Sequence, residues 1–493
     1  MVTSSKTAAQ KKRARQAAAA RTRLIGRLLR RVFGVEQLRP GQREVIDSVL
    51  EGRNTLAVMP TGSGKSLCYQ IPASILPGTT VVVSPLISLM QDQLDKLEEI
   101  GIRAAQVNSS LPREEELEAL SSIRARSSDI VFCTPERLAT PEFRELLQAT
   151  DIDLVVIDEA HCISQWGHDF RPAYLDIGAA VAALGRPPVL ALTATATSEV
   201  VADLAEQLGV KELNVINTGI YRPNLHYRVL QITNAEEKLE QALALVQGAA
   251  GAGIVYTATV KAAEELHAVL EQAGVSVALY HGRLPAQQRR DSQEQFMRGE
   301  RRVMVATNAF GMGIDKADVR FVLHLQVPAS LEAYYQESGR AGRDGEAADC
   351  TLLYFQDDKR LQQFFLVKSH QQSEKQQRDR EALELMVGYA QSGYCRWKLL
   401  LDYFGDTAPG FEQCGCCDNC QAPPQVELEP GEEFAATAEP GTEAEQAPFA
   451  VGSRVRVPKF DVGTVLSVTG DQVTIEFPEN TTRTFMAEFV EPA

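Results

Sequence analysis

The sequence predicts an α/β protein with two tandem parallel-sheet domains, followed by a helical metal-binding module and a small β-barrel. Short apolar runs alternate with charged helical stretches up to about residue 355, which is typical of parallel sheets covered by helices on both faces. A cysteine cluster then spans residues 414–420, and short alternating strands fill the last forty residues. At about 150 residues per domain, 493 residues leave room for roughly three such units.

The composition excludes several classes of protein. It includes 44% hydrophobic and 23% charged residues, as in globular proteins, and no apolar run approaches the roughly 20 residues of a membrane-spanning helix. The N-terminus has Lys and Arg among small residues in place of an apolar export segment. Nine cysteines in such a chain are expected to be thiols or metal ligands. We therefore expect an intracellular protein that has no membrane partner.

The predicted elements follow in chain order. Residues 24–50 carry apolar residues at spacings of three and four, which predicts a helix. Residues 356–405 are also expected to be helical, and Gly470-Asp471 predicts a hairpin turn in the barrel. The strands of two sheets, with a break near Gly209–Arg228, are predicted at Leu56–Met59, Val81–Ser84, Ile130–Thr134, Leu154–Asp158, Val189–Thr193, Gly253–Thr257, Val277–His281, Val303–Thr307 and Phe321–His324.

Charge is distributed unevenly over the predicted domains. Residues 1–35 carry a net +10 and residues 421–493 a net −9, which leaves −16 for residues 36–420. Non-specific nucleic-acid binding depends on clustered Lys and Arg, so an acidic middle gives no general sign of such a partner. The predicted domains are a basic arm (1–32), a first lobe (33–210), a second lobe (211–357), a helical metal-binding module (358–422), an acidic linker (423–449) and a barrel (450–493).

A glycine-rich segment follows the first predicted strand. Residues 59–66 read MPTGSGKS and precede a helical stretch. Successive backbone N–H groups in such a turn surround the phosphates of a nucleotide, with Lys65 at the β- and γ-phosphates and the Ser66 hydroxyl on Mg²⁺. Met59 stands where the general pattern has its first glycine, so a simple tight turn is the alternative interpretation.

Two acids, Asp158 and Glu159, stand at the end of the apolar run that begins at Leu154. At the tip of a parallel strand beside a phosphate loop, Asp158 can hold the Mg²⁺ shell, and Glu159 can orient or deprotonate the attacking water. Packing alone does not place two acids at the end of a buried strand. The two motifs together predict a nucleoside triphosphatase.

Ordered motifs over residues 33–420 resemble the RecQ family of superfamily 2 DNA helicases. The resemblance implies two RecA-like lobes of the P-loop NTPase type, an ATP- and Mg²⁺-dependent activity, DNA as the partner, and a place in the bacterial cytoplasm or nucleoid. The matching segments are Leu38–Gln42, Thr61–Ser66, Ser84–Gln91, Asp158–His161, His161–Arg171, Ala191–Thr197, Val303–Asp315 and Gln336–Gly345.

The resemblance implies roles around the nucleotide. Gln42 would read the adenine edge, since its amide both donates and accepts, and Asp315 would contact the ribose. Arg340 and Arg343 would reach the γ-phosphate from the second lobe, Arg343 as an arginine finger, so the site would act only when the lobes close. A surface glutamine and a solvated arginine pair are the alternatives. The implied ATP contacts are Arg39, Gln42, Thr61, Gly62, Ser63, Gly64, Lys65, Ser66 and Asp315.

A track for single-stranded DNA is also implied by the resemblance. Hydroxyls and backbone N–H groups position phosphates without any net positive charge, and exposed aromatic rings stack bases without sequence preference. For Trp166 the alternative is a buried core residue. The implied contacts are Ser84, Thr134, Arg137 and Thr193 on the first lobe, Thr257 and Thr307 on the second, and Trp166, His168, Phe170 and Arg171 in an aromatic-rich loop.

The cysteine cluster predicts a zinc site. Tetrahedral Zn²⁺ favours four thiolates, and Cys414, Cys417 and Cys420 with the distant Cys395 supply them in a pattern that resembles the RecQ zinc module. Cys416 is an extra thiol that could compete with Cys414, and disulfide pairing is the alternative to a metal. The remaining cysteines are expected to be small core residues: Cys68, Cys133, Cys162 and Cys350.

The two ends of the chain have less specific signals. The C-terminal barrel resembles the Tudor-like module of UvrD/PcrA-type repair helicases through residues 455–460, 463–465 and 487–489. It would bind a protein or nucleic acid, or serve only as a stabilising tail. The N-terminal basic arm would contact phosphate or remain a solvated tail. RecQ relatives usually continue into a winged helix and often a further helical domain, whereas here the acidic linker follows Cys420 directly.

The function implied by the resemblance is that of an ATP-dependent 3′→5′ DNA helicase. It would translocate on single-stranded DNA and unwind forked or branched DNA in repair and recombination, and we expect it to act as a monomer. One alternative is a translocase or remodeller that unwinds weakly. Another is a DNA-bound adaptor that recruits a partner protein through the barrel. An RNA substrate also stays open, because phosphate contacts do not read the 2′-OH.

Overall fold

The structure is a computed structural model that divides into two compact units, Met1–Pro424 and Gln425–Ala493. Several predictions lie outside the residues it describes: Trp166, His168, Phe170, Asp315, the basic arm up to residue 18 and the linker at 423–449. No helix within the described residues is both long and apolar enough to cross a membrane. The described residues are 19–164, 171–311, 314, 316–368, 373–422, 453–457, 460–469, 472–477, 481–486 and 491–492.

The first lobe is a seven-stranded parallel sheet with the order β3-β4-β2-β5-β6-β1-β7. Its inner strands are buried on both faces, as their apolar β-branched residues predict. The strands are β1 (Thr55–Val58), β2 (Thr79–Val83), β3 (Ala104–Val107), β4 (Ile130–Cys133), β5 (Ile152–Ile157), β6 (Val189–Thr193) and β7 (Asn214–Asn217). The helices are α2 (Gln42–Leu50), α3 (Leu67–Ala73), α4 (Ile87–Glu99), α5 (Arg113–Arg124), α6 (Pro135–Leu138), α7 (Pro141–Gln148), α8 (Ile177–Ala183) and α9 (Ser198–Gln207), with 3-10 turns η1 (Ala160–Ile163) and η2 (Pro172–Tyr174).

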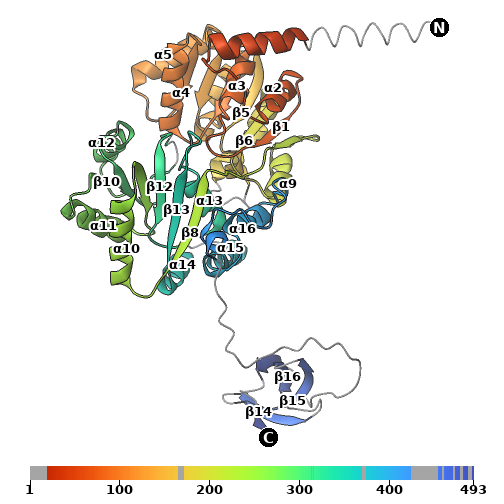
Figure 1. The fold of residues 1–493 in the computed structure, drawn as a ribbon. Coiled ribbons are helices and arrows are strands. Elements are labelled where there is room, and N and C mark those ends of the chain that lie inside the picture. The colour runs from red at the N-terminus through yellow and green to blue at the C-terminus, as the bar shows by residue number, and fades with distance from the viewer. Residues whose placement is uncertain are drawn as a thin grey trace. The chain divides into compact units, whose positions relative to one another are not determined.

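The second lobe is a six-stranded parallel sheet with the order β10-β11-β9-β12-β13-β8. Figure 1 shows α10 and α11 on one face of its strands, and α13, α15 and α16 on the other. The strands are β8 (Leu225–Ile232), β9 (Ala252–Tyr256), β10 (Val277–Tyr280), β11 (Val303–Ala306), β12 (Val319–His324) and β13 (Ala348–Phe355). The helices are α10 (Ala235–Gly248), α11 (Val260–Gln272), α12 (Ala286–Met297) and α13 (Leu331–Ser338).

A helical module follows the second sheet, and an antiparallel sheet forms the second unit. Trp397 of the helical module is fully buried, and its Nε1 donates to the Leu225 carbonyl of β8 at 3.0 Å. The five-stranded antiparallel sheet has the order β17-β16-β15-β14-β18. The elements are α14 (Gln356–Lys368), α15 (Ser373–Gln391), α16 (Arg396–Tyr403), α17 (Asp418–Gln421), β14 (Arg454–Val457), β15 (Phe460–Thr469), β16 (Gln472–Phe477), β17 (Thr481–Met486) and β18 (Glu491–Pro492).

Polar caps set the starts of several helices that follow strands. The side chains of Thr134, Thr197, Asn234, Thr259 and Ser330 each accept a hydrogen bond from the backbone N–H three residues later. Such a cap satisfies one of the N–H groups that have no partner inside the helix. The chain is thereby directed into each helix at a defined residue after the strand.

The predicted helix at residues 24–50 is wrong as a single element. Residues 19–31 are helical, but the next helix begins only at Gln42. Between them Gly34 and Gly41 have φ angles of +65° and +78°, and Pro40 lacks a backbone N–H. The prediction failed because apolar residues keep their helical spacing through this segment, although its glycines and its proline turn the chain.

Four strands were not predicted, and one of them moves a domain boundary. β7 pairs with β1 in the first sheet, so the first lobe extends to Asn217 rather than ending at residue 210. β7 and β8 are edge strands. Half-buried and exposed residues alternate in β7, and in β8 the buried residues are separated by half-buried or exposed ones, so neither forms a continuous apolar run. β3 and β13 were also missed.

Candidate nucleotide site and zinc centre

The described motif residues of both lobes line one cavity of about 430 Å³. The first lobe contributes the P-loop after β1 and the acids after β5, and the second lobe contributes Arg340 and Arg343 after α13. Ligands of parallel α/β sheets commonly bind beyond the carboxyl ends of the strands, where these loops lie. The cavity therefore combines a phosphate loop, carboxylates and arginines from two sheets.

The P-loop backbone has the geometry that its glycines predict. Gly62 and Gly64 have φ angles of +80° and +79°, in the left-handed region that glycine adopts without strain. A Cβ on Gly64 would lie 2.7 Å from Gln42 Nε2, so the position has no room for a side chain. The turn presents backbone N–H groups in the manner of anion-binding loops.

Lys65 is positioned by the segment that precedes the P-loop. Its Nζ donates to the Met59 carbonyl at 3.2 Å. Burial lowers the pKa of Lys65, whereas the negative charges of Glu159 and Asp158 oppose that shift, and the charge of Arg343 lowers the pKa further. An anionic phosphate would favour the charged ammonium group at this place.

Gln42 supports the P-loop rather than only facing the cavity. Its Nε2 donates to the carbonyls of Ser63 at 3.0 Å and Gly64 at 2.8 Å, and its Oε1 accepts from the Arg39 N–H at 2.7 Å. Arg39 Nη1 donates to the Gly62 carbonyl. Both ends of the Gln42 amide thus have protein partners, and its predicted contact with adenine stays a prediction.

Asp158 lies directly after β5 and lines the cavity. Its Oδ2 accepts from the Ser84 hydroxyl at 3.4 Å and its Oδ1 from the Glu159 N–H at 3.1 Å. Burial raises the pKa of Asp158 to about 7, and the charge of Glu159 adds to the shift while Lys65 opposes it. A bound cation reverses such a shift, because it favours the carboxylate.

Glu159 has two features of a functional residue. Its φ of +49° is unusual for a residue with a side chain, and strained backbone of this kind occurs at active sites. Its Oε2 is buried without a hydrogen-bond partner among the described residues, and it lies 3.5 Å from His161 Nδ1. A buried carboxylate oxygen of this kind fits a water molecule or a hydrated Mg²⁺ ion held between Glu159, Asp158 and Ser66.

The second lobe contacts the P-loop of the first through Arg343. A Cβ on Gly62 would lie 3.1 Å from Arg343 Cγ, which places the Arg343 side chain against the P-loop. Arg340 also lines the cavity, and its Nη2 lies beside Gly311 of its own lobe, 3.0 Å from where a Cβ on that glycine would be. Gln336 Nε2 also lies 3.5 Å from His161 Nε2, so α13 contacts the turn that follows the acids.

The predicted DNA-contacting hydroxyls all follow strand ends, as expected, but most already have protein partners. Thr193 donates to the Thr195 carbonyl at 2.8 Å and contacts His161, and Thr134 caps α6. Arg137 pairs with Glu116 at 2.7 Å. Ser84, Thr134 and Thr193 lie after or at the ends of β2, β4 and β6, and Thr257 and Thr307 lie after β9 and β11; all five are buried.

Arg171 is the only described residue of the four predicted in the aromatic-rich loop. It lies at the N-terminal end of η2, and its backbone N–H donates to the Cys162 carbonyl at 3.0 Å. Arg222 and Asn224 were not predicted as site residues. Both donate hydrogen bonds to the loop that carries Arg340 and Arg343. Because that loop is far away in the sequence, no local sequence pattern indicates these contacts.

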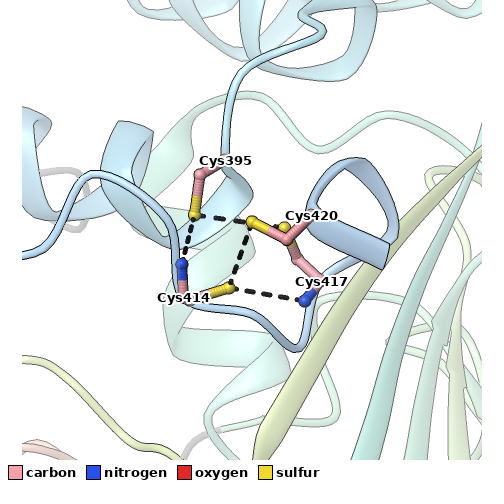
Figure 2. Close-up of side chains that lie close together, drawn as sticks. All are labelled: Cys395, Cys414, Cys417 and Cys420. Carbon is pink, nitrogen blue, oxygen red and sulfur yellow. Dashed lines mark hydrogen bonds between the residues drawn. The ribbon is translucent and has the colours of Figure 1, made fainter. Parts of the chain in front are cut away.

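Four cysteines form a compact metal-binding set. Ligand atoms of Cys395, Cys414, Cys417 and Cys420 all lie within 4.8 Å of one another. Figure 2 shows the four side chains close together. The Cys414–Cys420 and Cys417–Cys395 Sγ distances are 3.9 and 4.0 Å. Thiolates 2.3 Å from a central zinc ion are about 3.8 Å apart in a tetrahedron, so the donor set fits zinc.

The alternatives left open by the cysteine pattern can be compared with this geometry. All nine cysteines are free thiols, which does not support disulfide pairing. Cys416 Sγ lies 3.6 Å from Cys414 Sγ but does not belong to the four-residue set. Burial raises the pKa of the Cys417 thiol to about 11, so a metal ion is needed to hold the thiolate at neutral pH. The remaining four cysteines are fully buried, as predicted.

Three domain families match the chain in the order of its regions. They are DEAD/DEAH box helicase over residues 39–204, helicase conserved C-terminal domain over 235–345, and RecQ zinc-binding over 356–421. The chain is 44% identical over 337 residues to the probable ATP-dependent DNA helicase RecS of Bacillus subtilis, an alignment that covers 67% of both chains. The chain belongs to the RecQ family.

Other RecQ relatives extend beyond the aligned region. The ATP-dependent DNA helicase RecQ of Bacillus subtilis is 47% identical over 395 residues, which cover 80% of this chain and 66% of the relative. That of Haemophilus influenzae is 40% identical, over 81% of this chain and 64% of the relative. The chain thus spans slightly less than two thirds of these relatives.

Solved structures confirm the two-lobed fold of this RecQ-family chain. Mycobacterium smegmatis helicase Lhr, bound to ssDNA and AMP-PNP, has a TM-score of 0.57 at 21% identity and covers 73% of this chain and 48% of its own. Mss116p, bound to ssRNA and AMP-PNP, has a TM-score of 0.56 at 19% identity, over 73% and 79%. At these identities the similarity concerns the fold.

Serine substitutions should distinguish Cys417, a predicted zinc ligand, from Cys416, which lies outside the ligand set. We expect Cys417→Ser to lose bound zinc and to lower the melting temperature, since structural zinc contributes about 10–16 kcal/mol in zinc-finger peptides. The matched variant Cys416→Ser should retain one zinc ion per chain. Elemental analysis and thermal unfolding of both variants measure this, and zinc loss in Cys416→Ser alone would show that the ligand set is wrong.

The raised pKa of Asp158 predicts a pH dependence of stability. Between pH 4 and pH 7 the folded protein holds a proton that the unfolded chain releases, so stability falls as pH rises, by on the order of 1 kcal/mol per pH unit. Urea unfolding at pH 5 and pH 7 should show a larger loss in wild type than in Asp158→Asn. Mg²⁺ should reduce the wild-type loss. Asp291→Asn, on the exposed side of α12, is the control and should behave as wild type.

Proposed function

We propose that this chain is an ATP-dependent DNA helicase, which hydrolyses ATP between its lobes and moves along single-stranded DNA. The observation that carries the proposal is the cavity lined by the P-loop and acids of one lobe and by Arg340 and Arg343 of the other. A site that needs groups from both lobes acts only when they approach, so hydrolysis is coupled to lobe movement. The names of the RecQ relatives support the same activity.

Each group at the cavity has a proposed part in the reaction. Lys65 and the P-loop N–H groups bind the phosphates, and Glu159 orients the attacking water and accepts its proton. Arg343 and Arg340 stabilise the charge that develops on the γ-phosphate. Ser66 and Asp158 hold Mg²⁺, which would neutralise phosphate charge when bound. Gln42 and Asp315 select the nucleotide through the adenine and the ribose, and Asp315 lies outside the described residues.

The proposed DNA track runs over the strand ends of both lobes. Ser84, Thr134 and Thr193 lie on the first lobe, and Thr257 and Thr307 on the second, so lobe closure changes the spacing between two sets of phosphate contacts. The relatives' names support DNA as the substrate. We propose 3′→5′ movement, unwinding of forked or branched DNA in repair and recombination, a monomeric form, and a cytoplasmic place of action.

An ATPase assay tests the shared core of this proposal. Wild type with Mg²⁺ should release phosphate faster when single-stranded DNA is added. Lys65→Ala and Arg343→Ala should lower kcat, the latter by about 10³-fold or more, since an arginine finger contributes about 10³–10⁵ in rate. The exposed Lys261→Ala on α11 is the control and should match wild type. No phosphate release from wild type would contradict the proposal, and stimulation by RNA alone would reassign the substrate.

A strand-displacement assay tests polarity and unwinding. Forked, 3′-tailed, 5′-tailed and blunt duplexes are compared with ATP and with the Lys65→Ala variant. We expect displacement of forked and 3′-tailed duplexes by wild type only, because translocation on the tailed strand precedes opening of the helix. Displacement limited to 5′-tailed duplexes would reverse the polarity. ATPase activity without displacement would instead favour a translocase that unwinds weakly.

A further inference from the structure

Arg222 lies in the segment that connects the two lobes, between β7 and β8. Its side chain is only 8% exposed. Nη1 donates to the Gly339 carbonyl at 2.7 Å, and Nη2 donates to the carbonyls of Ala341 at 2.7 Å and Gly342 at 2.5 Å. One guanidinium group therefore holds the backbone on both sides of Arg340.

The carbonyls that Arg222 contacts lie just past the end of α13. The helix ends at Ser338 with Gly339 as its C-cap, and the last carbonyls of a helix accept no hydrogen bond inside it and carry the negative end of the helix dipole. Beyond the cap, the Gly342 carbonyl also accepts from the Gly345 N–H at 3.1 Å. A buried cation at this end is stabilised without a carboxylate, and within the described residues Arg222 donates only to carbonyls. The planar fork of arginine reaches several acceptors at once, which lysine does not.

Asn224 adds to the same attachment. Its Nδ2 donates to the carbonyls of Gly342 and Glu346, both at 2.8 Å. Gly342 itself has a φ of +54°, and its N–H donates to the Val319 carbonyl at 2.8 Å. The loop between α13 and β13 is thus bonded both to Arg222 and Asn224 of the connecting segment and to Val319 of β12. Arg343 directly follows Gly342, the last residue that Arg222 contacts.

The other end of the connecting segment is attached to the P-loop strand. The Thr218 N–H donates at 3.0 Å to the carbonyl of Val58, the last residue of β1. Gly219 has a φ of +80°, and the Ile220 N–H donates to Asp406 of the helical module at 2.7 Å. Only three residues along the chain therefore separate Thr218, which is attached to β1, from Arg222, which is attached to the arginine loop.

We propose that Arg222 is a positioning residue for ATP hydrolysis. It holds the backbone of residues 339–342 so that Arg340 and Arg343 project into the nucleotide cavity, and it fixes this loop to the segment about which the lobes move. Arg222 does not line the 430 Å³ cavity and acts through the two arginines. The inference rests on the proposed roles of Arg340 and Arg343 in hydrolysis.

A double-mutant cycle in the full-length, zinc-loaded protein tests the inference. Arg222→Met removes the donors at similar volume and should lower the DNA-stimulated kcat by about 10²-fold, since a displacement of about 1 Å has an effect of that size. The KM for ATP and the affinity for a fluorescent ATP analogue should change less than about threefold. Adding Arg222→Met to Arg343→Ala should lower kcat little further, because Arg222 acts through the loop that carries Arg343.

Control variants distinguish positioning from a general structural role. Arg228→Met removes an exposed arginine of β8 whose Nη2 donates to Thr351 Oγ1 at 3.3 Å, and this variant should match wild type. Melting temperature and zinc content are measured for every variant. If Arg222→Met does not fold, the same cycle is run with Arg222→Lys, which keeps the charge and should show a smaller loss of kcat at unchanged KM.

The outcomes distinguish a failure of the inference about Arg222 from a failure of the proposed function. If Arg343→Ala lowers kcat but a folded Arg222 variant does not, the inference is overturned and the proposed function stands. Equal losses from an Arg222 variant in the wild-type and Arg343→Ala backgrounds would also overturn it, because the two residues would then act independently. If Arg343→Ala itself leaves kcat unchanged, the proposed role of the arginine finger fails first.

Discussion

Charged groups from two separate sheets share one partly buried cavity, and the rest of the site depends on this. Burial lowers the pKa of Lys65 and raises that of Asp158, so the protein surroundings alone oppose the charged form of each. Arg343 adds positive charge from the second lobe next to Lys65. A magnesium nucleotide carries both negative phosphates and a cation, so it would favour the charged forms of Lys65 and Asp158 and offset the positive charge of Arg343. In the proposed function, its binding energy is what draws the lobes together.

The lobes are joined in a way that limits how they can move. The connecting segment is attached to β1 at Thr218 and to the arginine loop at Arg222. Asp406 of the helical module accepts from the Ile220 N–H between these points. In the proposed function, a movement of one lobe would rotate about this short segment, whose ends lie beside the phosphate loop and the arginine loop. Small rotations there would change the distance between these two loops.

The sequence predicted those parts of the site that depend on local chemistry. Glycines at positive φ, a lysine after them, and acids after a buried strand can be recognised because strand ends of a parallel sheet meet at one edge. The four cysteines of the metal-binding set were also predicted, three from their short spacing and the distant Cys395 from the resemblance to the RecQ zinc module. Periodicity failed where the chain turns at Gly34 and Gly41, and where the edge strands β7 and β8 are only half buried.

Arg222 shows why the rest of the site was not predictable. Nothing adjacent to it in the sequence indicates a role, because its acceptors lie more than a hundred residues away, at the end of α13. Gln42 is a second case: its flanking motif predicted adenine recognition, but not the hydrogen bonds that its amide donates to the carbonyls of Ser63 and Gly64 in the P-loop. Local motifs identify the reacting groups, whereas the groups that position them emerge only from tertiary contacts.

The helical module packs against the second lobe as part of it. Arg396, which is buried, forms an ion pair with the half-buried Asp418 at 3.0 Å, and Asp418 Oδ2 accepts from the Val229 N–H of β8 at 2.8 Å. The zinc ligands Cys395 and Cys417 flank these two residues in the sequence. Zinc bound by these cysteines would therefore hold together the two short segments that attach to β8, the strand that begins directly after Asn224. Because Arg222 and Asn224 precede this strand and contact the arginine loop, a bound zinc ion would act on the position of that loop through β8, without a ligand that lines the cavity within the described residues.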